Sequence, residues 1–249
     1  MAKLILFNKP FGVLSQFRTD DNNDFATLSD YFNDKRLRVA GRLDATSEGL
    51  LLLTDDGHVN QALTHPPTTP NHKKQGKTYW VQLDGTATDE QIERLRQGVV
   101  LKDGLTLPAI VERLPDNTHD TLWQAPDGIA KRKITSWLSI TIVEGKNRQV
   151  RRMTAHVGLP CLRLVRIASS GFELGKLAVG EYREMVLDKA DLLRLGVKCQ
   201  PLVNMPLINT LSNPVPKNAK QPQKNVTKPL KLPKIKRDFL GKNPRKSDN

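Results

Sequence analysis

The sequence is poor in the residues that usually hold metal ions or cofactors. It has two cysteines, Cys161 and Cys199, in 249 residues, and its five histidines lack the spacing of a zinc site. It also lacks a glycine-rich loop with phosphate-binding spacing. These absences exclude the common zinc, nucleotide and dinucleotide signatures. If the chain is an enzyme, we expect it to work with side chains alone, with no metal and no cofactor.

Long hydrophobic runs are also missing. No stretch approaches the roughly 20 apolar residues of a membrane-spanning helix. The apolar run at residues 4–7 stops at Lys9 and Pro10, which is unlike a signal peptide. With so few cysteines, the chain is expected to be cytoplasmic, with reduced thiols and no membrane contact, and to act as a monomer.

Acidic residues are scarce relative to basic ones. The formal net charge is +13, and +9 of it lies in residues 200–249, which also hold eight of the sixteen prolines. Such a segment buries too little apolar surface to offset its ordering entropy, so we expect a disordered tail. Basic tails attract polyanions such as RNA. The alternative is an appendage that only improves solubility.

The pattern along the remaining chain predicts a mixture of strands and helices without a βαβ repeat. We expect strands at 4–7, 50–53, 77–83 and 137–143, helices at 27–32, 59–63 and from the capping box 88–91 up to Gly98, and irregular structure at 112–134. The prediction is an α+β fold with a mixed, largely antiparallel central sheet and flanking helices. Its catalytic domain would span residues 1–190, with a subdomain at about 1–66, a linker at about 64–76 and the remainder at 77–190.

One charged loop leads directly into an apolar strand. Arg42, Asp44 and Glu48 precede the four leucines of 50–53, and Gly41 and Gly49 bracket the acid. Glycines allow tight turns, and a buried strand is a rigid support for a catalytic carboxylate. The alternative is a surface loop with solvated charges.

A second charged segment follows the strand at 137–143. Read as a helix over 147–157, it places Arg148, Arg151 and Arg152 on one face and its apolar residues on the other. Guanidinium groups suit bidentate contacts with phosphate or carboxylate. The alternative is an ordinary solvated basic face.

Taken together, these motifs resemble those of the RsuA-type pseudouridine synthases. The matching segments cover about residues 3–188: the Lys-Pro turn at 7–14, the acidic motif at 41–44 and 47–54, the tyrosine motif at 77–79, the basic motif at 144–153, and the closing segments at 164–167, 174–177 and 180–183. Because the match begins near residue 3, we expect no N-terminal S4 RNA-binding domain, which many family members carry. The expected absence of this domain favours the subgroup of the family that acts on large-subunit ribosomal RNA.

The resemblance implies roles for individual residues. Asp44 would act at the ribose, as a nucleophile at C1′ or as a base at C2′. Tyr79 would lie against the flipped base and assist proton removal from C5, and Arg151 would pair with Asp44. Arg42 would help to occupy the space that the uridine leaves. Phosphate contacts would come from Arg148, Arg152 and the tail.

The implied function is isomerisation of a specific uridine to pseudouridine in 23S ribosomal RNA of the large subunit or its precursor. Two alternatives stay open. The chain could be a non-catalytic RNA-binding or ribosome-assembly protein that keeps the fold. It could also be a synthase that acts on small-subunit ribosomal RNA or transfer RNA.

Overall fold

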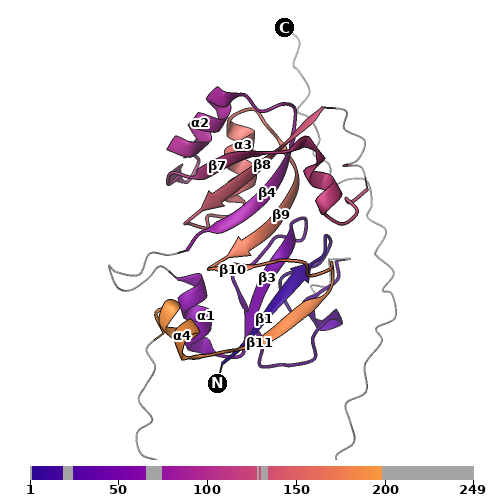
Figure 1. Cartoon of the computed structure of the whole chain (residues 1–249), viewed down its shortest axis with the longest axis vertical. Helices are drawn as coiled ribbons and strands as arrows, with labels where there is room; N and C mark the ends of the chain where they lie inside the picture. The colour runs from indigo at the N-terminus through magenta and orange to yellow at the C-terminus, as the bar shows by residue number, and fades with distance from the viewer. Residues whose placement is uncertain (1, 19–24, 66–74, 128, 130–133, 198–249) are drawn as a thin grey trace, which may run out of the picture. The chain divides into compact units, whose positions relative to one another are not determined.

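The computed structural model describes residues 2–18, 25–65, 75–127, 129 and 134–197 (Figure 1). Residues 1–199 form one compact unit, and the predicted tail at 200–249 lies outside the described residues. In chain order the elements are β1 (Ala2–Lys9), η1 (Leu28–Asp30), β2 (Arg38–Ala40), β3 (Glu48–Thr54), α1 (Gly57–Thr64), β4 (Lys77–Asp84), α2 (Asp89–Gln97), β5 (Val100–Leu101), β6 (Gly104–Leu105), β7 (Ile110–Leu114), η2 (Asp116–Thr121), β8 (Thr135–Ile142), α3 (Gln149–His156), β9 (Cys161–Ser169), β10 (Phe172–Glu173), β11 (Tyr182–Leu187) and α4 (Lys189–Arg194).

A mixed sheet organises the fold, with the strand order β11-β1-β3-β9-β4-β8-β7. Most neighbouring strands are antiparallel, and β3 with β9 is a parallel pair. This confirms the predicted α+β class and the largely antiparallel sheet. Figure 1 shows β11, β1 and β3 on one side of the parallel junction and β9, β4, β8 and β7 on the other.

The four-leucine run forms the centre of the first group of strands. Leu50, Leu51, Leu52 and Leu53 are all fully buried in β3, as predicted. Because side chains alternate across a strand, Leu51 and Leu53 enter one hydrophobic cluster while Leu50 and Leu52 enter another. The strand is therefore covered on both faces, which makes it a rigid base for the loop that precedes it.

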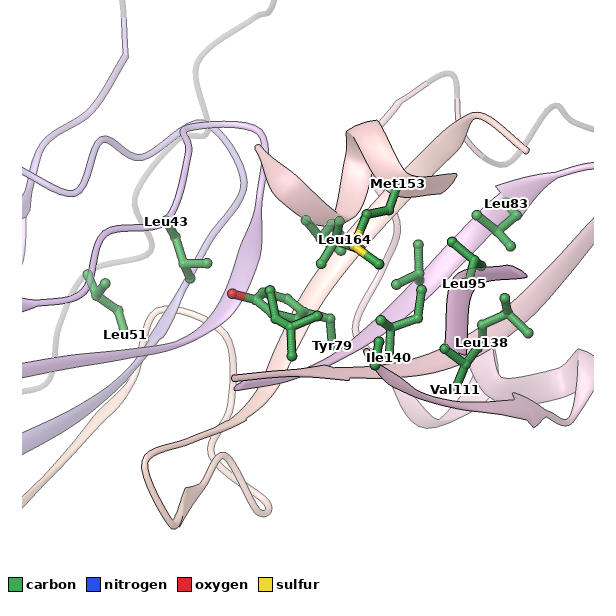
Figure 2. Packing of buried hydrophobic residues seen from close by; sticks show 14 of the residues in the cluster. Leu43, Leu51, Tyr79, Leu83, Leu95, Val111, Leu138, Ile140, Met153 and Leu164 are labelled. Atoms are coloured by element: carbon green, nitrogen blue, oxygen red, sulfur yellow. The ribbon is translucent and has the colours of Figure 1, made fainter. Parts of the chain in front are cut away.

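Two helices cover one face of the second group of strands. Ile92 and Leu95 of α2 and Met153 of α3 share a cluster with Val81 of β4 and Leu138 of β8. Figure 2 shows Leu95, Met153 and Leu138 within this cluster. The capping box predicted at Thr88 is present, and the helix it starts ends before Gly98. The cluster fixes α3, which carries the basic motif, against the strand that carries Tyr79.

Some predicted elements are wrong in extent. The helix expected at 27–32 is a single 3₁₀ turn, Leu28–Asp30, with Thr27 as its N-cap. The segment 112–134, expected to be irregular, contains part of β7 and all of η2. Only Val111 of β7 is buried, so the edge strand lacks a clear alternating pattern. The helix expected from 147 begins at Gln149.

The predicted linker lies partly outside the described residues, because 66–74 are not described. Among the residues that are described, no helix combines the length and apolar character needed to cross a membrane.

Candidate active site

The loop of residues 41–47, called here the Asp44 loop, connects β2 to the buried strand β3. Gly41 has a φ of +85°, a conformation that favours glycine, and it lets the chain turn as it leaves β2. Inside the loop the amide of Ser47 donates a hydrogen bond of 3.0 Å to the carbonyl of Asp44. The carboxylate of Asp44 therefore sits on a closed turn at the entrance of a rigid strand.

Residues near the N-terminus hold the middle of the Asp44 loop. The hydroxyl of Ser15 donates to the carbonyl of Leu43 at 2.7 Å and accepts from the Leu43 amide at 3.0 Å. The carbonyl of Ala45 accepts from the amide of Gly12 at 2.8 Å and from the Nζ atom of Lys9 at 3.5 Å. The loop's polar backbone is thus satisfied without regular secondary structure.

Two arginines, one from α3 and one from β9, reach the same loop. The Nη2 atom of Arg151 donates to the carbonyl of Thr46 at 2.8 Å. The Nη2 atom of Arg166 donates to the carbonyl of Gly41 at 3.1 Å. These bonds hold the two ends of the loop against α3 and β9.

A third arginine pairs with the acid itself. The Nη1 atom of Arg148 lies 3.2 Å from the Oδ2 atom of Asp44, and both side chains are partly exposed. Arg148 precedes α3 in a left-handed conformation, with a φ of +47°. The prediction that Arg151 pairs with Asp44 is wrong, because Arg151 instead binds Thr46 and contacts Cys161. The left-handed turn at Arg148 directs this side chain to the acid.

The three arginines of the basic motif have different partners. Arg152 makes a bidentate pair with Asp103 in the turn between β5 and β6, at 2.7 and 2.9 Å. This pairing lowers the pKa of the Asp103 carboxyl below its usual value. The opposite face is as predicted, since Val150, Met153 and Val157 are buried.

A cleft of about 270 Å³ opens beside the Asp44 loop. Four of the six residues singled out in the sequence line it: Arg42, Asp44, Tyr79 and Arg148. The Tyr79 side chain is 8% exposed, and in Figure 2 its hydroxyl points toward the chain segment that carries Leu43. Arg151 and Arg152 do not line the cleft. Tertiary folding thus brings the predicted acid and the predicted tyrosine to one cavity.

The charges around the cleft are strongly unequal. Among the described residues that line it, Asp44 carries the single carboxylate, whereas Arg42, Lys77, Lys146, Arg148 and Arg166 carry cations. A cavity lined in this way attracts a polyanion and presents one acid to it.

Charged residues that the sequence did not predict to be buried lie beneath the loop. Glu48 and Arg163 form an ion pair at 2.9 Å with side chains 2% and 1% exposed, and the Trp123 indole donates to Glu48 at 2.6 Å. Lys9 is fully buried, and burial lowers its pKa to about 7 against the opposing attraction of Glu48. A sequence signal existed for one of them: Arg163 stands inside the apolar strand β9, where an unpaired charge is costly.

Comparison with known proteins agrees with this geometry. The family model described as RNA pseudouridylate synthase matches residues 3–156. The chain belongs to this family. The match covers both the Asp44 loop and the strand that carries Tyr79, and it extends to the end of α3.

Curated relatives of this synthase family cover most of the compact unit. The chain is 50% identical over 187 residues to the ribosomal large subunit pseudouridine synthase E of Vibrio vulnificus, covering 74% of this chain and 76% of that protein. It is 49% identical over 182 residues to the synthase of the same name from Xanthomonas campestris, covering 72% and 94%. A crystal structure of a pseudouridylate synthase superposes with a TM-score of 0.60 at 29% identity, covering 78% and 74%.

Proposed function

We propose that this chain isomerises a specific uridine to pseudouridine in the 23S ribosomal RNA of the large subunit. The observation that carries the proposal is the meeting of Asp44 and Tyr79 in a cleft that otherwise presents cations. Membership of the pseudouridylate synthase family supports the reaction. The names of the relatives from Vibrio and Xanthomonas support the large-subunit target.

The reaction begins with cleavage of the bond between N1 of the uracil and C1′ of the ribose. Positive charge develops at the sugar during this step, and a nearby carboxylate stabilises or captures it. Asp44 supplies this carboxylate, either by attacking C1′ or by removing the proton from C2′. Because Arg148 contacts one oxygen of Asp44, the other oxygen stays available for the sugar.

The detached uracil then turns and forms a bond from C5 to C1′. The proton on C5 leaves in the last step, and N1 gains a proton, so the product is an isomer of the substrate. Tyr79 contacts the base and assists removal of the C5 proton. Arg42, exposed at the rim of the cleft, occupies space that the extruded uridine leaves in the RNA.

The single acid favours isomerisation over hydrolysis. Glycoside hydrolases usually use two carboxylates, one of which protonates the leaving group or activates water. Among the described residues lining this cleft, Asp44 is the carboxylate and no second one accompanies it. An enzyme that retains the base and returns it to the same sugar does not need to activate water.

We also propose the setting in which the protein works. The protein acts as a monomer in the cytoplasm on ribosomal RNA or on a precursor particle. The catalytic domain covers about residues 1–190. Arg148, Arg151 and Arg152 belong to the motif that serves the site, Arg148 at Asp44 and Arg151 at the loop backbone.

The decisive experiment compares cells that lack the protein with cells that carry Asp44→Asn. Pseudouridine is mapped across ribosomal and transfer RNA in both. One 23S site should be lost in both strains, while the purified variant keeps its fold and RNA affinity. Residual product from Asp44→Asn would contradict the role of Asp44. Loss of a site in small-subunit or transfer RNA would move the target, and no lost site at all would favour a non-catalytic RNA-binding protein.

The basic segment at 200–249 is proposed to add RNA affinity through phosphate contacts. Its charge of +9 should steepen the dependence of affinity on salt. RNA affinity is measured over a range of salt concentrations with the full chain and with residues 1–199. Equal slopes would contradict this contribution.

A further inference from the structure

The cleft lies where the two groups of strands join, and this junction is narrow. Among the described residues, β3 and β9 pair in register at Glu48 with Val165 and at Gly49 with Arg166. Asp44 belongs to the first group of strands, whereas Tyr79 belongs to the second. The position of the acid relative to the tyrosine therefore depends on what holds the Asp44 loop across the junction.

Arg166 spans that junction with a single side chain. Its Nε atom donates to the carbonyl of Leu50 at 2.7 Å, and its Nη2 atom donates to the carbonyl of Gly41 at 3.1 Å. Gly41 is the first residue of the Asp44 loop, and Leu50 lies in β3 just after the loop ends. The residue is 1% exposed, so its guanidinium is held in place by the protein.

The chemistry of the guanidinium suits this task. Its donors lie in one rigid plane, so two bonded acceptors are fixed relative to each other. Replacing buried charged groups by well-packed apolar residues is often neutral for the stability of a protein. Stability alone therefore does not explain a buried arginine at this position. Both hydrogen bonds that Arg166 makes end on main-chain carbonyls next to the loop. The arrangement restricts where the loop can lie.

Ser15 binds the middle of the same loop. Its hydroxyl is bonded to both the amide and the carbonyl of Leu43, the residue before Asp44. Ser15 is 7% exposed and does not line the cleft. Arg166 thus ties the start of the loop to the strand that follows it, and Ser15 holds the middle of the loop.

We propose that Arg166 and Ser15 are positioning residues that set the reach of the Asp44 carboxylate toward the sugar across the junction of β3 and β9. The inference rests on the proposed function, because it assigns these residues to the isomerisation step. Neither residue takes part in bond making or breaking. Their loss lowers the rate of the chemical step while RNA binding stays as it was.

The test uses the full chain with Arg166→Lys, because lysine keeps the positive charge but lacks the rigid planar set of donors that fixes two acceptors relative to each other. Single-turnover formation of pseudouridine should slow by about tenfold to hundredfold, the usual effect of a misplaced catalytic group. The affinity for RNA should stay unchanged. Hydrogen exchange at the amides of Leu43 and Ser47 should become faster, which reports on the loop without any need for activity.

A matched control is Arg96→Lys. Arg96 also donates from Nε and Nη2 to a main-chain carbonyl, that of Val111, at 3.0 and 2.8 Å, but it joins α2 to β7. This variant should keep the wild-type rate and the wild-type exchange in the Asp44 loop. Ser15→Ala is a second variant that loosens the loop, and it should likewise slow single-turnover formation of pseudouridine while leaving the affinity for RNA unchanged. If Arg166→Lys does not fold, Ser15→Ala provides the test of the proposal.

Several results would overturn the inference. A wild-type rate in Arg166→Lys would do so, or in Ser15→Ala if the arginine variant is unfolded. Equal losses of rate and RNA affinity would show that Arg166 is an RNA-binding group. If the wild-type chain forms no pseudouridine in any RNA, the proposed function fails. Hydrogen exchange then still decides whether these residues hold the loop.

Discussion

Arg148 and Asp44 are 104 positions apart in the sequence, yet the Nη1 atom of one lies 3.2 Å from the Oδ2 atom of the other. The contact joins the turn before α3 to the loop before β3. It gives the single carboxylate of the cleft a cationic partner that keeps one oxygen occupied.

Replacing Arg148 should affect catalysis more than folding. Arg148→Gln removes the partner that orients Asp44, so single-turnover formation of pseudouridine should slow by on the order of tenfold. Because the pair is partly exposed, the free energy of unfolding should change by less than about 1 kcal/mol. The control Arg152→Gln removes the same charge from a guanidinium bound to Asp103, and it should slow the reaction less. Equal rates for the two variants would contradict a special role for Arg148.

The buried ion pair of Glu48 and Arg163 should show strong energetic coupling. Glu48→Gln leaves the Arg163 guanidinium buried without a counter-charge, which costs about 3–5 kcal/mol. Arg163→Met should cost a similar amount, and the double variant should recover part of the loss. Urea unfolding of all four proteins measures the coupling. Losses that simply add would show that the pair contributes no mutual stabilisation.

Gly49 should be intolerant of any side chain. Its φ is +95°, and a Cβ atom there would lie 2.4 Å from the carbonyl oxygen of Arg166. Gly49→Ala therefore suffers both backbone strain and a clash with main chain. Gly41→Ala is the control, because Gly41 has a φ of +85° but nothing within 4 Å of its Cβ position. Gly41→Ala should lose about 1 kcal/mol from strain, and Gly49→Ala clearly more. Equal losses of unfolding free energy in the two variants would mean that β3 and β9 move apart at Gly49 without an energetic cost.

Lys9 should make stability depend on pH. Burial lowers the pKa of Lys9 from its usual 10.5 to about 7 in the folded protein. Between these values the unfolded chain binds more protons than the folded one, so raising the pH through this window favours the folded state. Lys9→Met removes this contribution. The difference in unfolding free energy between wild type and Lys9→Met should therefore grow in favour of wild type from pH 7 to pH 10. A difference that does not change with pH would contradict the shift.

The elements that the sequence predicted well are those with strong local signals. The leucine run became β3, the aromatic and β-branched segment became β4, and the capping box at Thr88 started α2. These patterns depend on residues within one turn or one strand. The edge strand β7 was missed because only Val111 of its five residues is buried.

In the candidate site, too, the residues carried by local motifs were predicted well and the contacts between distant residues were not. The motif at 41–49 pointed to Asp44, and the motif at 77–79 pointed to Tyr79, and both line one cleft. The partner of the acid was predicted wrongly, because a regular helix from residue 147 does not anticipate the left-handed conformation of Arg148. Arg148 therefore takes the place beside Asp44 that was expected of Arg151, and Arg151 binds the loop backbone at Thr46.

The sequence by itself determined the fold class, the family and the acid at the centre of the site, since each is carried by short motifs whose spacing is visible along the chain. Only the tertiary structure decided which cations hold that acid and its loop. Arg148, Arg163 and Arg166 reach Asp44, Glu48 and Gly41 across separations of 104 to 125 positions. Such contacts depend on the parallel pairing of β3 with β9 and on the packing of α3, and neither leaves a periodic signal in the sequence.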